Sequence, residues 1–235
     1  MKRDSNAYTV IYAAVMVVAV AVVLAFTSQS LRSLQKENED NDKRRQILRS
    51  IHIDVPSDQA QAAFNELISD AFLVDHHGKQ IEGDAFQVDI MKTFADRKYP
   101  VFVANVNGQI KYIMALQGSG LWGPLWGYIA INDDRNTVFG ADFSHAGETP
   151  GLGAEIATAF FSKPFAGKHL FRDGRFASVA VVKPGKQDLD RDFVDGISGG
   201  TITSAAVDRM LFDCLSAYVA FLNSNLAIDH GALDN

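Results

Sequence analysis

Four hydroxyl side chains lie close together near the C-terminus of this chain, in a segment rich in glycine. Residues 195–204 read DGISGGTITS, and the hydroxyls belong to Ser198, Thr201, Thr203 and Ser204. A glycine-rich turn that leads into a helix offers free backbone N–H groups and the positive end of the helix dipole, which suit a phosphate group. The residues alone leave a simpler interpretation open, namely a tight turn with Thr203 or Ser204 as an ordinary N-cap.

The same segment matches the pattern G-x-S-x-G, which is typical of a hydrolase nucleophile elbow. Its residues are Gly196, Ser198 and Gly200. An elbow of this kind requires an Asp and a His later in the chain, and the only later histidine is His230, close to the C-terminus. The alternating strand–helix pattern of a hydrolase sheet is also missing, so a serine hydrolase is a weak alternative.

Two further loops are rich in glycine. Residues 145–153 read HAGETPGLG, but G-x-G-x-x-G is incomplete there and no parallel βαβ unit surrounds it, so this is not a dinucleotide fingerprint. Residues 118–127 read GSGLWGPLWG and contain both tryptophans of the chain, Trp122 and Trp126. Tryptophans in such a loop more often contact a planar ligand, a partner or a membrane interface than a core.

Charge and cysteine content exclude several classes of partner and site. Residues 51–235 contain fourteen Lys and Arg against twenty-three Asp and Glu, and this acidic balance argues against a nucleic-acid partner. The single cysteine, Cys214, excludes an internal disulfide framework and any cysteine-rich metal site. The adjacent His76 and His77 are a weak metal signal that we assign to a surface turn, so no metal site is predicted.

The N-terminal region predicts a membrane anchor. Residues 7–26 carry no charge, and a helix of that length spans about 30 Å, the thickness of the hydrocarbon core. A cleaved signal peptide is the alternative, but the apolar stretch is long for one and no A-x-A site follows it. The positive charges on the two sides do not decide the orientation of the anchor.

The rest of the chain predicts an α+β fold with an antiparallel sheet and flanking helices. Residues 27–50 are expected to form a polar stalk, and the folded domain is expected to begin near Ile51. A helix is predicted from Ser57 to about Ile68, and a hairpin is predicted around Asn107-Gly108. The other expected strands are 101–106, 109–116, 127–131, 137–142 and 176–182. A final helix carries an apolar stripe that includes Cys214, which we expect to be buried.

The three loops together make the chain resemble the C subunit of the sodium-translocating NADH:quinone oxidoreductase, with the G subunit of the Rnf-type ferredoxin:NAD oxidoreductase as a close relative. The resemblance covers the anchor, the stalk, the Gly/Trp loop, E-T-P-G-L-G at 148–153 and a flavinylation sequence of the form D-x-x-S-G-A-T-x-T-S. Gly200 departs from that sequence, since alanine is usual there. The G-L-W-G-P-L-W-G stretch is more similar to the sodium pump than to its Rnf relative.

The resemblance implies a covalent flavin and a set of residues around it. FMN is expected to be attached by a phosphoester to Thr201, within a motif that includes Asp195, Ser198, Gly199 and Gly200. The expected cofactor-binding residues are Trp122, Glu148, Thr149, Leu152, Lys183, Ser198, Gly199 and Thr203. A separate flavin transferase that uses FAD is expected to attach the FMN.

The resemblance also implies an activity and a location. The chain is expected to relay electrons from NADH toward quinone, coupled to sodium export, together with other subunits of the complex. It further implies the inner membrane, with residues 1–26 as cytoplasmic N-terminus and transmembrane helix, 27–50 as stalk and 51–235 as a periplasmic FMN-binding domain. The G subunit of the Rnf complex, a serine hydrolase using Ser198 and a noncatalytic anchored binding module are the alternatives.

Overall fold

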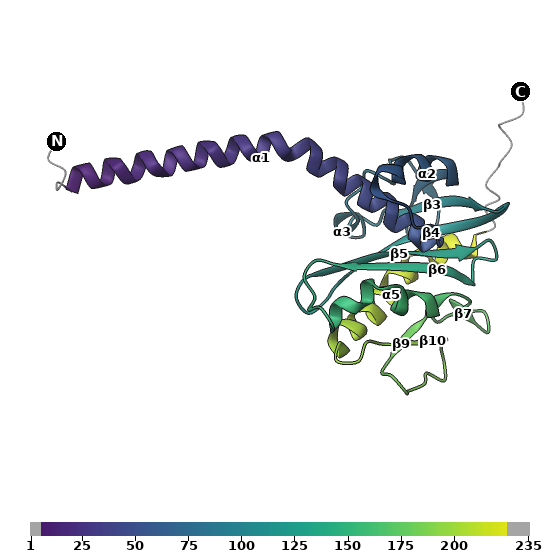
Figure 1. The fold of residues 1–235 in the computed structure, drawn as a ribbon. Coiled ribbons are helices and arrows are strands. Elements are labelled where there is room, and N and C mark those ends of the chain that lie inside the picture. Colours follow the sequence, from purple (N-terminus) through teal and green to yellow (C-terminus); the bar gives the residue numbers. More distant parts are fainter. Residues whose placement is uncertain (1–5, 225–235) are drawn as a thin grey trace, which may run out of the picture. The chain divides into compact units, whose positions relative to one another are not determined.

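The structure, a computed structural model, describes residues 6–224. His230 therefore lies outside the described residues. The chain begins with one long helix, α1 (Asn6–Ser50), shown in purple in Figure 1. This helix is long and apolar enough to cross a membrane by its length and composition. It extends beyond the apolar stretch because residues 27–50 contain neither glycine nor proline to interrupt it.

The folded domain begins earlier than residue 51. The chain divides into two compact units, residues 1–43 and residues 44–235. Ile47 and Leu48, in the last turns of α1, are fully buried within the second unit together with Ile51. The expected boundary between stalk and domain is corrected accordingly, because the apolar side chains of this last part of α1 contribute to a domain core.

The domain is built on a six-stranded antiparallel sheet with the order β2-β1-β3-β4-β5-β6. This confirms the predicted α+β fold with an antiparallel sheet. The strands are β1 (Ile68–Val74), β2 (Gln80–Ile81), β3 (Tyr99–Val106), β4 (Gln109–Ser119), β5 (Pro124–Asn132) and β6 (Val138–His145). The turn between β3 and β4 has positive φ at Asn107 and Gly108, as expected for a two-residue hairpin turn.

Shorter elements surround the sheet, and two of them differ from the sequence-based prediction. The helix predicted to reach Ile68 consists of η1 (Ser57–Gln59) and α2 (Ala60–Leu67), and β1 begins at once without a turn residue. The predicted strand 176–182 is interrupted where Ser178 has a φ of 61°. The remaining elements are α3 (Ile90–Thr93), η2 (Gly153–Ala157), α4 (Ala159–Ser162), η3 (Lys163–Phe165), β7 (Phe171–Arg172), β8 (Arg175–Phe176), β9 (Ala180–Val182), β10 (Phe193–Asp195) and α5 (Thr201–Asn223).

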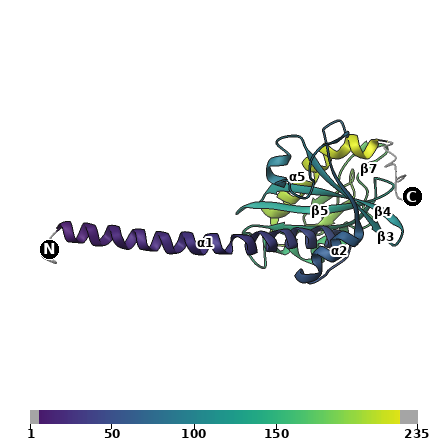
Figure 2. The same ribbon diagram turned by 90° about the horizontal axis from the view of Figure 1, so that it is seen from above.

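Each face of the sheet has its own hydrophobic core. Side chains alternate between the faces, so that Val101 and Val103 pack with α5, whereas Phe102 packs with the end of α1. Figure 1 shows α2 and α5 on opposite sides of the strands, and Figure 2 shows the same arrangement from above. Cys214 lies in the α5 core, as predicted, and burial raises the pKa of its thiol to about 12.

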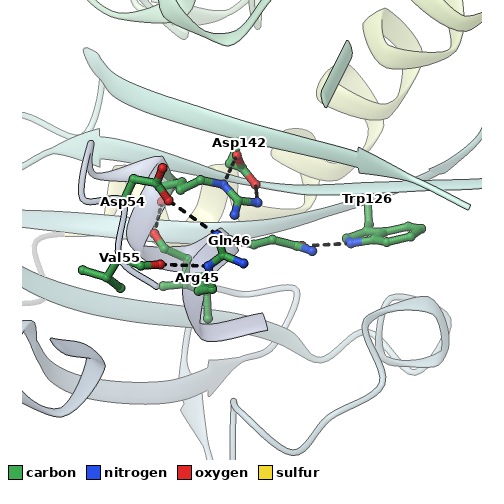
Figure 3. Close-up of polar contacts among 9 residues, drawn as sticks. Arg45, Gln46, Asp54, Val55, Trp126 and Asp142 are labelled. Carbon is green, nitrogen blue, oxygen red and sulfur yellow. Dashed lines mark hydrogen bonds and ion pairs between the residues drawn. The ribbon is translucent and has the colours of Figure 1, made fainter. Parts of the chain in front are cut away.

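Polar contacts hold the last turns of α1 to the rest of the domain (Figure 3). The guanidinium of Arg49 donates to both carboxylate oxygens of Asp142 on β6, at 2.8 and 2.9 Å. Arg45 donates to the carbonyl of Val55, and the indole N–H of Trp126 donates to Gln46 Oε1 at 2.9 Å. Trp126, half-buried on β5, thus has a structural partner within the domain.

Candidate functional site

The predicted flavinylation segment forms a turn between β10 and α5. Gly199 has a φ of +78°, and the Gly200 N–H donates to the carbonyl of Ile197. Gly200 is the N-cap of α5, and no side chain caps the helix there. The N–H groups of the first helical turn consequently point away from the helix body without an intrahelical acceptor, where the positive end of the dipole favours an anion. The simpler interpretation, with Thr203 or Ser204 as N-cap, is wrong.

The four hydroxyls of this segment are in different environments. Thr203 is 2% exposed and donates to Glu148 Oε2 at 2.6 Å. Ser204 is also buried, and its Oγ accepts from the N–H of Ile197 at 2.8 Å. Ser198 and Thr201 are exposed. On the first turn of α5, Thr201 is therefore the hydroxyl that remains accessible.

A cavity of about 230 Å³ opens beside Thr201. It is lined by residues from three segments that are distant in sequence: the Gly/Trp loop, the E-T-P-G-L-G loop and the start of α5. The lining residues are Leu121, Glu148, Thr149, Leu152, Gly153, Gly199, Gly200, Thr201, Ile202 and Thr203. The fold thus brings together most of the residues that the resemblance implied.

Three of the lining residues were not predicted, namely Leu121, Gly153 and Ile202. Each of the three lies next to a predicted site residue in the sequence, and this proximity could have indicated them. The side chains of Leu121, Trp122, Leu152 and Ile202 are exposed and large, and Trp122 is 68% exposed. Apolar groups exposed together around a cavity are typical of a ligand-binding or partner-binding surface.

Four predicted residues do not line this cavity: Trp122, Lys183, Asp195 and Ser198. Asp195 ends β10 and is paired in register with Val182, the last residue of β9. Lys183 follows Val182, so it lies at the same end of this two-stranded sheet as the start of the turn. Lys183, Asp195 and Ser198 are all exposed. Their roles stay predictions.

Glu148 occupies the wall of the cavity with its carboxylate satisfied by neighbouring donors. It is 5% exposed, and its Oε1 accepts from the Trp122 N–H at 3.0 Å. Burial alone raises the pKa of Glu148, but hydrogen bonds from Thr203, Trp122 and Leu121 lower it below its ordinary value. Glu148 is therefore ionised at neutral pH.

Glycine allows the loops to approach this carboxylate closely. A Cβ atom at Gly120 would lie 2.3 Å from Glu148 Oε1. A Cβ atom at Gly153 would lie 2.3 Å from Thr203 Oγ1 and 2.5 Å from Glu148 Oε2. A side chain at either glycine would force the hydrogen-bonded Glu148 and Thr203 side chains to shift, so these glycines allow the two loops to close on the carboxylate.

The hydrolase alternative gains no support. Within residues 6–224, Ser198 forms no hydrogen bond with a histidine, and the main sheet is antiparallel, whereas a hydrolase elbow belongs to a mostly parallel one. A strand does precede the turn, but β10 pairs with β9 alone.

Comparison with known proteins identifies the family of this chain. Residues 120–216, which include Glu148 and Thr201, match the model of the FMN-binding domain family. The C subunit of the Na(+)-translocating NADH-quinone reductase of Yersinia pestis is 30% identical, over 88% of this chain and 87% of that protein. The crystal structure of the same subunit from Parabacteroides distasonis ATCC 8503 has 64% identity and a TM-score of 0.81, and the match covers 83% of this chain and 98% of that one.

A second crystal structure, that of Shewanella oneidensis NqrC, is 24% identical with a TM-score of 0.67, and the match covers 79% of this chain and 97% of that one, which supports the fold. The first structure and the curated relative together confirm the resemblance on which the site residues were chosen. They also favour the sodium pump over the Rnf alternative. This chain belongs to the family of the C subunit of the Na(+)-translocating NADH-quinone reductase.

Proposed function

We propose that this chain is the electron-transfer subunit that carries FMN in a sodium-translocating NADH:quinone reductase, with the FMN bound through a phosphoester to Thr201. The observation that carries the proposal is the position of the Thr201 hydroxyl. It is accessible on the first turn of α5 and borders the cavity, whereas the hydroxyls of Thr203 and Ser204 are buried in internal hydrogen bonds.

The residues around Thr201 suit the two parts of FMN. The N–H groups of the first turn of α5 and the helix dipole favour the negative charge of a phosphodiester. The exposed apolar side chains of Leu121, Trp122, Leu152 and Ile202 offer a surface for the planar ring system. When bound, FMN supplies the electron-carrying chemistry, and the protein supplies binding, orientation and electrostatic tuning.

Attachment requires a phosphoryl donor, which we take to be FAD acted on by a separate flavin transferase. The oxygen of Thr201 forms a new bond to the phosphorus of the FMN half, and the bond between the two phosphates breaks. AMP leaves, and the hydroxyl proton of Thr201 passes to a base of the transferase. The exposure of Thr201 gives such an enzyme access to this oxygen.

In the assembled complex, electrons that originate from NADH reach this subunit through its neighbours and leave toward quinone, so the chain has no net redox change. We further propose that residues 7–26 anchor it in the inner membrane, with the N-terminus in the cytoplasm and the flavin domain in the periplasm. Coupling of this electron flow to sodium export belongs to the complex as a whole.

The test is the intact mass of the full chain, produced with and without a flavin transferase. The wild-type chain should gain the mass of one FMN less one water, as a phosphoester requires, and fluoresce in a denaturing gel. Thr201→Val should lack both signals while its circular dichroism stays that of the folded protein. Ser216→Ala is the matched control, because Ser216 is an exposed hydroxyl residue further along α5 that does not line the cavity, and it should remain flavinylated. A Thr201→Val chain that still carries covalent flavin would refute the assignment.

A further inference from the structure

Glu148 connects two segments that are distant in the sequence. Its Oε2 accepts the hydroxyl hydrogen bond of Thr203 on α5, and its Oε1 accepts the N–H of Trp122 in the Gly/Trp loop. The Leu121 N–H is a further donor to the same carboxylate. Both oxygens are therefore engaged, and the side chain holds the loop and the helix at one junction in the cavity wall.

The groups that donate hydrogen bonds to Glu148 are uncharged, so they do not neutralise the negative charge of its carboxylate. In the part of the chain that the structure describes, no lysine or arginine forms an ion pair with this carboxylate. His145 lies nearby, but its Nδ1 accepts the backbone N–H of Glu148 at 3.2 Å. A negative charge thus lines the cavity beside Thr201.

We propose that Glu148 positions the Gly/Trp loop against α5 and lowers the reduction potential of the flavin in this cavity. This inference rests on the proposed function, because it requires FMN on Thr201. Reduction adds electrons to the flavin, and a fixed carboxylate in the wall of the same cavity opposes the added negative charge. The hydrogen bonds to Thr203, Leu121 and Trp122 prevent the carboxylate from turning away.

Three substitutions in the full, FMN-loaded chain separate charge from position. Glu148→Gln removes the charge, while its amide can donate to the Thr203 oxygen and its carbonyl can accept from the Trp122 N–H. Thr203→Val removes one hydrogen bond and keeps the charge. Glu155→Gln is the matched control, because Glu155 belongs to the same region of the chain, accepts from the Gly151 N–H and does not line the cavity.

The midpoint potential of each variant is measured by spectroscopic redox titration in detergent, at neutral pH. We expect Glu148→Gln to shift the potential in the positive direction by more than either Thr203→Val or Glu155→Gln. A potential equal to that of the wild type in Glu148→Gln would overturn the electrostatic role. A wild-type chain that never acquires FMN would refute the proposed function itself, so the two failures are distinguishable.

Amide hydrogen exchange in the flavin-free chain tests the positioning role without the cofactor. Hydrogen bonds to a charged group are stronger than those between neutral groups, so loss of the carboxylate should accelerate local exchange about tenfold or more. We expect this acceleration at Trp122 and Leu121 in Glu148→Ala, with Glu155→Ala unchanged. Wild-type exchange at both amides would overturn the positioning role. If Glu148→Ala does not fold, Glu148→Gln decides the proposal through the redox titration.

Discussion

Breaking the ion pair between Arg49 and Asp142 should destabilise the domain more than most single substitutions. Asp142 lies on β6, and its side chain is 10% exposed, whereas that of Arg49 is 31% exposed. Removal of one partner from a buried pair typically costs about 3–5 kcal/mol, because the other charge is left without compensation. Since Arg49 is partly solvated, we expect Arg49→Met to lower the free energy of unfolding by about 3 kcal/mol.

The effect should depend on pH in a direction that the environment of Asp142 determines. Burial raises the pKa of Asp142 above its ordinary value, and the hydrogen bonds and charge of Arg49 oppose that rise. Without Arg49 the pKa should rise further. Because a folded-state pKa above the unfolded value means that the folded state binds the proton more tightly, acidification favours folding through this group. The stability deficit of Arg49→Met should therefore shrink as the pH falls from 7 toward 5.

Urea unfolding of the full chain in mild detergent, followed by circular dichroism, measures this deficit. With an m-value of about 2 kcal/mol/M, a loss of about 3 kcal/mol lowers the midpoint by about 1.5 M at neutral pH. The double variant Arg49→Met/Asp142→Leu removes both charges and should recover at least half of the loss. A deficit below about 1 kcal/mol at pH 7, or a double variant no more stable than Arg49→Met, would contradict this reasoning.

Two further predictions concern close packing around the site and the lone thiol. Gly153→Ala should abolish flavin loading, as measured by intact mass, because its Cβ would lie 2.3 Å from Thr203 Oγ1. Gly200→Ala should still load. The nearest atom to its Cβ is Ile197 Cβ at 3.1 Å, which needs to move by only a few tenths of an ångström. Equal loading of the two variants would refute the packing argument. Cys214, buried and with its pKa raised to about 12, should resist maleimide at pH 7 in the folded chain and react after unfolding; rapid labelling under native conditions would contradict its burial.

Features that depend on neighbouring residues were predictable from the sequence. The hairpin at Asn107-Gly108 and the apolar stripe of the last helix were both predicted and found, because turn chemistry and helical periodicity are local properties. Thr201 was named as the attachment residue because the family resemblance implied it, through one short motif of the sequence. Its assignment stays a prediction, but its place on the first turn of α5 agrees with the local pattern.

Other features depended on contacts between distant parts of the chain. Strand β1 was missed because Ile68 follows α2 without a turn residue, and its identity as a strand comes from pairing with β3. The end of α1 was assigned to the stalk because its polar composition does not reveal that Ile47 and Leu48 face a core.

The site itself shows the same division between local pattern and tertiary contact. Without the family resemblance, the residues alone did not distinguish the hydroxyls of Thr201 and Thr203, which belong to one glycine-rich segment. The tertiary structure distinguishes them, because Glu148, fifty-five residues earlier in the chain, buries the Thr203 hydroxyl in a hydrogen bond and leaves Thr201 exposed beside the cavity. Local sequence patterns do not predict the hydrogen bond between Thr203 and Glu148, because it forms only when the sheet and α5 bring their two segments together.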